Sequence, residues 1–178
     1  FIPLAVLNNM RRCAITKLNE KRTANNKEFK EYDYTIKLPN FKKEQTLNLF
    51  CDCDETVKNY HGDLTKFKYI YSLDLPTKYI HSFPNIVDSY QNIKSLSPVL
   101  VGEIGGLSLI SNATKIHTDY SFNVVNSYTV AFLHSLGVEK ITLSYELTKE
   151  QIQNLVASYE KRYHVLPNLE VITYGYIK

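Results

Sequence analysis

One short stretch of the sequence concentrates side chains that can bind a ligand. Residues 119–127, DYSFNVVNS, supply one carboxylate, two amides and three hydroxyls between a strand-like run and a helical pattern. Loops between regular elements carry function more often than core positions, and backbone N–H groups at a helix start can bind an anion. We therefore predict that Asp119, Asn123 and Asn126 contact a ligand. The alternative is a local role, in which these side chains satisfy turn amides and Asn126 or Ser127 caps the next helix.

A second group of polar side chains follows the later strand-like runs. Ser144 and Glu146 come after one run, and Tyr174 ends the last one. We predict that these three residues add polar contacts to the same ligand, or else that Ser144 and Glu146 brace the loop before a helix. Ser144 has neither a nearby base nor a nucleophile elbow, so the sequence does not indicate a serine hydrolase.

The sequence predicts no metal site, and it assigns no catalytic residue. The five histidines show no metal-ligand spacing, and Cys51 with Cys53 is a poor metal signal by itself. His81 and His117 lie in strand-like runs and are predicted to be core or rim residues. No phosphate loop, zinc-protease motif or paired-carboxylate signature is present.

Composition indicates one ordinary globular domain. The chain has 178 residues, 44% of them hydrophobic, and its net charge of +3 is too small to predict nucleic-acid binding without clustering. Three cysteines without disulfide-framework spacing predict a reducing, cytoplasmic compartment, and no run of apolar residues is long enough to span a membrane. Because the chain begins at Phe1 and stops directly after a strand-like run, we expect a fragment of a longer protein.

The first 44 residues differ in pattern from the rest. A helix is predicted over residues 3–19, with Pro3 in its first turn. Residues 20–44 are rich in Lys and Asn and predict a polar connector with one short strand around Tyr34–Leu38. Apolar residues recur at helical spacing in the predicted helix: Leu7, Met10, Ala14 and Leu18.

From Thr46 onward, strand-like and helix-like runs alternate. Strands are predicted at residues 46–51, 67–71, 78–83, 99–102, 115–118, 140–143 and 169–174. Helices are predicted after an Asp54 cap, from Gly105, over residues 126–136 with Gly137 closing the helix, and after Thr148, where Gln151 completes a capping box. In the last helix one face is apolar: Ile152, Leu155, Val156 and Tyr159.

This alternation predicts an α/β fold with a mainly parallel sheet covered by helices. Since no dinucleotide-binding glycine fingerprint is present, we favour a partial (β/α) barrel, similar to a TIM barrel, over a doubly wound sheet. Residues 1–44 would form an N-terminal helix and connector from a preceding domain, and residues 45–178 a barrel-like unit truncated at its C-terminal end. In such a barrel, functional side chains gather at the carboxyl ends of the strands.

Several of these stretches together resemble peptidase family U-32, the collagenase-like proteins of unknown catalytic type. The residues that carry the resemblance are DYSFNVVNS at 119–127, TLSYEL at 142–147 and EVITYG at 170–175. The opening residues 1–18 resemble the segment that leads into a second barrel-like unit in longer members. Glu103 departs from the family pattern, which tends to have Asn at that position.

The resemblance implies a barrel-like fold and three functional alternatives. Several members are proteases, which implies a peptide substrate. Others take part in hydroxylation of RNA bases and carry an iron–sulfur cluster, whose cysteines would lie beyond Lys178, so no cofactor is expected in this chain. The third alternative is a degenerate, non-catalytic barrel used for binding or scaffolding. The residues also allow a further alternative, a barrel enzyme of another family that acts on a small phosphorylated substrate. We expect this fragment to be inactive by itself.

Overall fold

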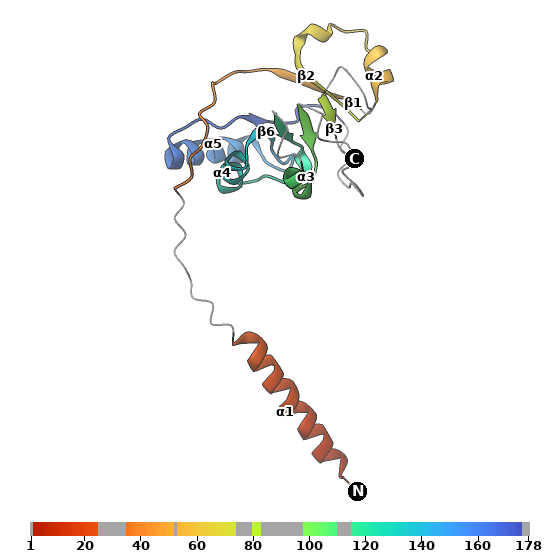
Figure 1. Ribbon diagram of the computed structural model, residues 1–178, viewed down its shortest axis with the longest axis vertical. Helices are drawn as coiled ribbons and strands as arrows, with labels where there is room; N and C mark the ends of the chain where they lie inside the picture. The colour runs from red at the N-terminus through yellow and green to blue at the C-terminus, as the bar shows by residue number, and fades with distance from the viewer. Residues whose placement is uncertain are drawn as a thin grey trace. The chain divides into compact units, whose positions relative to one another are not determined.

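The structure is a computed structural model that describes residues 2–24, 35–51, 53–73, 80–82, 98–109 and 115–175. The chain divides into two compact units, Phe1–Thr35 and Ile36–Lys178 (Figure 1).

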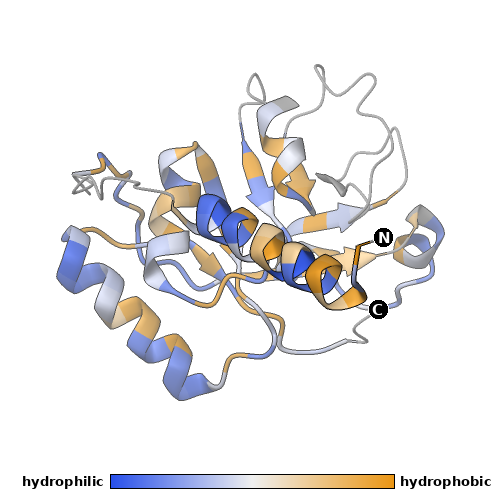
Figure 2. Ribbon diagram, turned by 90° about the horizontal axis from the view of Figure 1, so that it is seen from below, coloured by the Kyte–Doolittle hydropathy of each residue, from blue (hydrophilic) through white to orange (hydrophobic). Residues whose placement is uncertain are grey.

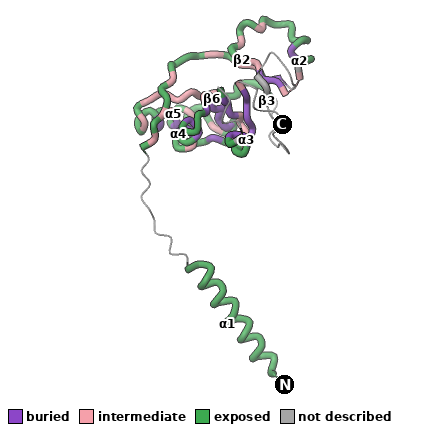
Figure 3. Tube along the Cα trace, viewed as in Figure 1, coloured by how far each residue is buried: buried purple, intermediate pink, exposed green. Residues whose placement is uncertain are grey.

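The first unit contains one long helix, α1 (Leu4–Thr23). Pro3 precedes it with extended backbone, and Lys21 and Arg22 in the last turn suit the negative end of the helix dipole. The helix runs four residues past the predicted end at residue 19, because Glu20 to Thr23 contain no helix breaker. None of its residues is buried (Figure 3).

The second unit is built on a parallel sheet of seven strands, counted over the described residues. The strands lie in the order of the sequence, β1-β2-β3-β4-β5-β6-β7, and each pairs in parallel with the next. Their bounds are β1 Leu47–Cys51, β2 Phe67–Ser72, β3 Ile80–Ser82, β4 Val99–Val101, β5 Ile116–Thr118, β6 Val138–Thr142 and β7 Leu169–Glu170. A parallel sheet requires crossover connections between its strands, and the helices of this unit lie in them.

The second unit contains four helices among the described residues, and α4 and α5 begin at side-chain caps. They are α2 (Asp54–Lys58), α3 (Ile104–Leu109), α4 (Ser127–Ser135) and α5 (Lys149–Tyr163), with short 3-10 turns η1 (Leu64–Lys66) and η3 (Tyr120–Phe122). The predicted capping box of Thr148 and Gln151 is present at the start of α5. Gly137 takes a φ of 90° just after α4, as a residue without Cβ can. The helix predicted after Asp54 is also present, but it begins at Asp54 and its cap is Cys53.

One face of the sheet packs against the helices and holds the hydrophobic core. Val99 and Val101 of β4 and Ile141 of β6 lie in this core with Leu155 and Tyr159 of α5. Hydrophilic and hydrophobic residues are mixed along the long helices (Figure 2), and α5 buries Leu155 and Tyr159 on one face. Along each strand the alternate side chains point to the opposite, inner face.

The sheet is curled toward that inner face. In a flat sheet the first and seventh strands would be roughly 29 Å apart, because neighbouring strands are spaced by about 4.8 Å. Here the side-chain amide of Asn48 in β1 donates a hydrogen bond to the carboxylate of Glu170 in β7. No backbone ladder joins these two strands among the described residues, so the predicted barrel stays a prediction.

Two predicted strands were wrong in whole or in part. Thr35 to Leu38 form no strand; Leu38 packs on the core, and the next residues bind Leu166, whose N–H donates to Asn40 Oδ1 at 3.1 Å. The last strand ends at Glu170 instead of residue 174, because only its first residues find partners on β6. Parts of three predicted elements, at residues 34, 78–79, 83 and 110, lie outside the described residues.

Candidate functional site

The inner face of the sheet carries polar side chains in two layers at its carboxyl-terminal side. Register places Thr142 of β6 beside Glu170 of β7, and His117 of β5 beside Lys140 of β6. Asp119 follows β5 in extended backbone and continues its register, so it lies level with Thr142. Asp119 and His117 are two residues apart and therefore face the same side.

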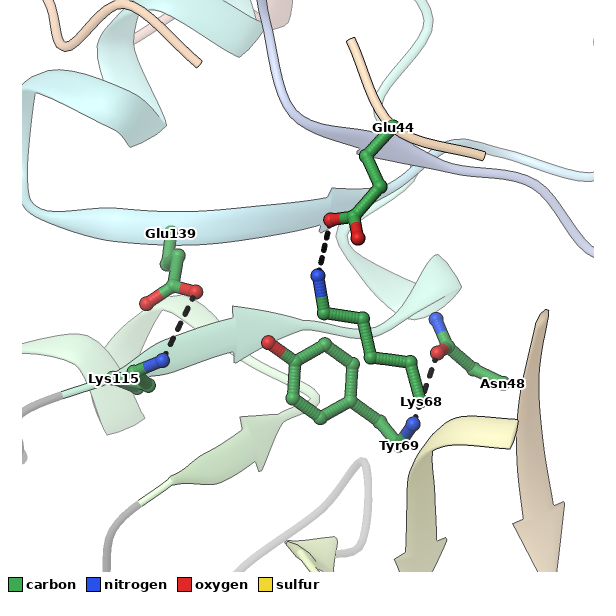
Figure 4. A network of polar contacts seen from close by, with 6 residues as sticks. All are labelled: Glu44, Asn48, Lys68, Tyr69, Lys115 and Glu139. Atoms are coloured by element: carbon green, nitrogen blue, oxygen red, sulfur yellow. Dashed lines mark hydrogen bonds and ion pairs between the residues drawn. The ribbon is translucent and has the colours of Figure 1, made fainter. Parts of the chain in front are cut away.

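In the upper layer, Glu170 accepts hydrogen bonds from side chains of three other strands. One carboxylate oxygen accepts the hydrogen bond from Asn48, and the other accepts from the Tyr71 hydroxyl at 3.3 Å and from the Thr142 hydroxyl at 3.2 Å. Asn48 also accepts a hydrogen bond from the backbone N–H of Tyr69 (Figure 4), which fixes the orientation of its amide. Side chains from β1, β2 and β6 thus converge on one carboxylate of β7.

His117 lies beneath this layer and is fully buried. Its Nδ1 is 3.1 Å from the Tyr71 hydroxyl, and its Nε2 has no hydrogen-bond partner within the described part of the chain. Burial and the nearby Lys140 cation lower the pKa of His117 to about 3. Burial, with a smaller effect from Glu170, raises the pKa of Tyr71. Both side chains are therefore neutral at physiological pH.

Lys140 extends along the same inner face. It is buried, with its Nζ 5.1 Å from the centre of the Tyr69 ring, and burial lowers its pKa. Toward the start of the strands, Lys68 pairs with Glu44 (Figure 4), and this contact lowers the pKa of Glu44 and raises that of Lys68. Unlike Lys140, the Lys68–Glu44 pair is exposed to solvent.

Asp119 is the predicted site residue that reaches this inner face. Its side chain is partly buried and accepts a hydrogen bond from the Tyr120 N–H at 2.7 Å. Burial raises the pKa of Asp119, the Tyr120 N–H opposes that shift, and the negative charge of Glu170 adds to it. A carboxyl group with a raised pKa can give and take a proton nearer neutral pH than an exposed aspartate.

The two predicted asparagines have different surroundings. Asn126 caps α4: its Oδ1 accepts from the Thr129 N–H at 2.9 Å and from the Thr129 hydroxyl at 3.1 Å. Asn123 is exposed and takes the left-handed conformation, with a φ of 48°, at the end of η3. Asparagine tolerates this conformation better than most residues, so its position has a backbone explanation.

The remaining predicted residues, Ser144, Glu146 and Tyr174, differ from Asp119 in their burial and hydrogen bonds. Ser144 is buried, and its hydroxyl accepts a long hydrogen bond, 3.4 Å, from the N–H of Glu146 within a turn. Glu146 is exposed, and Tyr174 is 97% exposed, so neither is held by packing.

A separate open groove of about 520 Å³ lies between the start of α4 and α5. It contains Asn126 and Glu146 among its lining residues but neither Asp119 nor any inner-face residue. Its lining combines the Asn126 helix cap with exposed polar side chains such as Glu146. The lining residues are Val125, Asn126, Ser127, Glu146, Leu147, Gln151, Asn154, Leu155 and Ser158.

Within the part of the chain that the structure describes, no group of three or more His, Cys, Asp or Glu residues is placed to hold a metal ion. None of Cys13, Cys51 and Cys53 takes part in a disulfide bond. The prediction of an iron–sulfur cluster concerns residues beyond Lys178 and stays a prediction. No helix among the described residues is long and apolar enough to cross a membrane.

The sequence did not single out Tyr71, Lys140 or Glu170 as site residues, and it treated His117 as a core residue. A signal was present, because strands buried on both faces usually read as continuous apolar runs. His117 between Ile116 and Thr118, and Lys140 before Ile141, interrupt such runs. A polar residue inside an otherwise apolar strand indicates that one face of the sheet is polar.

Fold and site together define an α/β protein whose polar groups gather at the carboxyl ends of parallel strands, the usual place of a ligand in such sheets. The family model of Peptidase family U32 matches residues 52–177, well over half of the 178-residue chain. The chain therefore belongs to peptidase family U32, as the sequence resemblance predicted. Comparison with curated proteins gave no significant match, and comparison with solved structures gave none either.

Proposed function

We propose that this domain binds a peptide at the carboxyl-terminal side of its curled sheet and contributes Asp119 as the acid–base group for hydrolysis of an amide bond. Membership of peptidase family U32 supports the substrate class. The observation that carries the proposal is the position of Asp119, a partly buried carboxyl at the end of β5 with a raised pKa. We interpret the curled sheet as part of a (β/α) barrel, in which this side is the functional one.

The chemistry assigned to Asp119 is proton transfer. As a carboxylate it takes a proton from the attacking water, and as the acid it returns one to the leaving amine. Its hydrogen bond from the Tyr120 N–H holds one oxygen in place and leaves the other for the reaction. Thr142 and Glu170 lie level with Asp119 and border the same site.

The test is peptide hydrolysis by the full-length protein with Asp119→Asn, which keeps the shape of the side chain and removes its proton chemistry. We expect a loss of about 10²- to 10⁴-fold in kcat, the usual contribution of a general acid–base group. The matched control is Asp63→Asn, since Asp63 is an aspartate that caps η1 at the surface. Unchanged kcat in Asp119→Asn, with cleavage retained in both variants, would rule the proposal out.

A non-catalytic binding domain is the second candidate. It is favoured by Asn126 and Ser144, since both make local hydrogen bonds that explain their presence without a ligand. In that case the protein would bind peptides without cleaving them, and Asp119→Asn would change affinity alone.

A further inference from the structure

We propose that Glu170 is a positioning residue for Asp119: it ties the first two strands of the sheet to the last two and fixes a negative charge in the layer where Asp119 lies. This inference rests on the proposed function, because it assigns Glu170 a role toward the proposed acid–base group. It goes beyond that function by naming a second carboxylate and the residues that hold it.

The geometry begins with the three donors to Glu170. Asn48 comes from β1, Tyr71 from β2 and Thr142 from β6, while Glu170 itself belongs to β7. An ionised carboxylate accepts such bonds at both oxygens and cannot donate, so all three partners must act as donors. The carboxylate therefore joins strands at opposite ends of the sheet order, across the curl of the sheet.

The charge of Glu170 also fixes the direction of the hydrogen bonds made by Tyr71 and His117. Tyr71 has one hydroxyl proton, and it donates that proton to Glu170. The Tyr71 oxygen is then an acceptor toward His117, so Nδ1 of the neutral imidazole must carry the proton at this 3.1 Å contact. His117 and Tyr71 form a directed chain of hydrogen bonds that ends on Glu170, and the carboxylate is held in one orientation.

Asp119 lies in the same layer as Glu170, with β6 between their two strands. Thr118 of β5 is in register with Ile141, and Ile141 with Leu169, so the next residues, Asp119, Thr142 and Glu170, are level. Two carboxyl groups on one face, separated by a single strand, disfavour simultaneous ionisation. Among the residues that the structure describes, Tyr69 and Tyr71 of β2, His117 of β5 and Lys140 of β6 are also titratable and lie on this face.

The experiment is a titration of the Asp119 side-chain carboxyl by NMR in the wild type and in Glu170→Gln. Removing the charge should lower the midpoint of the Asp119 titration while the circular dichroism of the protein stays that of a folded chain. Glu146→Gln makes the same change in net charge at an exposed turn residue and should leave the midpoint where it was. An unchanged midpoint in a folded Glu170→Gln protein would overturn the inference.

A second measurement covers the case in which Glu170→Gln does not fold. In the wild type, the Asp119 titration curve should carry a second inflection from ionisation of Glu170, because the two groups are coupled. A curve with a single step would overturn the inference without any variant. Neither readout uses peptide cleavage, so loss of the proposed hydrolytic function would leave this result standing, and the reverse also holds.

Discussion

His117 makes the stability of the fold depend on pH. It is neutral and buried, and its folded pKa of about 3 lies below its ordinary value of 6.5. The unfolded chain therefore binds the proton more readily than the folded chain. The stabilising effect is complete above pH 6.5 and is lost as the pH falls from 6.5 toward 3.

We expect His117→Gln to flatten this dependence. Between these pH values the free energy of unfolding of the wild type should fall by up to about 1.4 kcal/mol per pH unit more than that of the variant. Urea unfolding at a series of pH values measures the difference. His61→Gln, at an exposed histidine, is the control and should follow the wild type. Parallel curves for His117→Gln and the wild type would show that His117 is not held neutral by burial.

At the scale of single elements, Asn126 shows that a polar residue beside a candidate site can have a structural role. Its side chain satisfies the Thr129 N–H at the start of α4. Asn126→Ala should lower the free energy of unfolding by about 1 kcal/mol, the usual cost of a lost helix cap. Asn126→Asp should keep most of that stability, because aspartate also caps helices. If denaturant unfolding gives equal stability for all three proteins, the capping bond is not what selects asparagine here.

Local sequence signals predicted which helices and strands are present better than they predicted where each one ends or which side chains face the site. The capping box of α5 was confirmed because Thr148 and Gln151 satisfy each other within one turn. The end of β7 could not be read from the sequence, since β-branched residues such as Val171 and Ile172 favour a strand and only the partner strand decides where pairing stops.

The candidate site was predicted in part for the same reason. Asp119 follows a strand-like run, so the local order of elements alone predicted it as a candidate. Glu170 was missed as a site residue, because its partners Asn48 and Tyr71 lie about a hundred residues away in the chain. Contacts of that sequence separation arise from the curl of the sheet, and no local pattern encodes them.

At the scale of the whole molecule, the second unit begins at Ile36 and therefore includes residues 36–44. The core of the second unit includes Leu38, and the Phe41 ring lies 4.8 Å from that of His134. The Phe41 N–H also donates to the Leu166 carbonyl. The residues from 36 to 44 thus contribute packing and backbone hydrogen bonds, although the sequence assigned them to a polar connector.

Two truncations test this division. Removing residues 1–35 should change the free energy of unfolding of the remaining chain by less than about 1 kcal/mol, because α1 has no buried residue. Removing residues 1–44 should cost about 2–4 kcal/mol, since it also deletes the Leu38 and Phe41 side chains from the core and its edge. Guanidinium unfolding of both proteins measures the difference directly. Equal stability of the two truncated chains would place the boundary after residue 44, as the sequence predicted, and would mean that the contacts of Leu38 and Phe41 contribute little to folding.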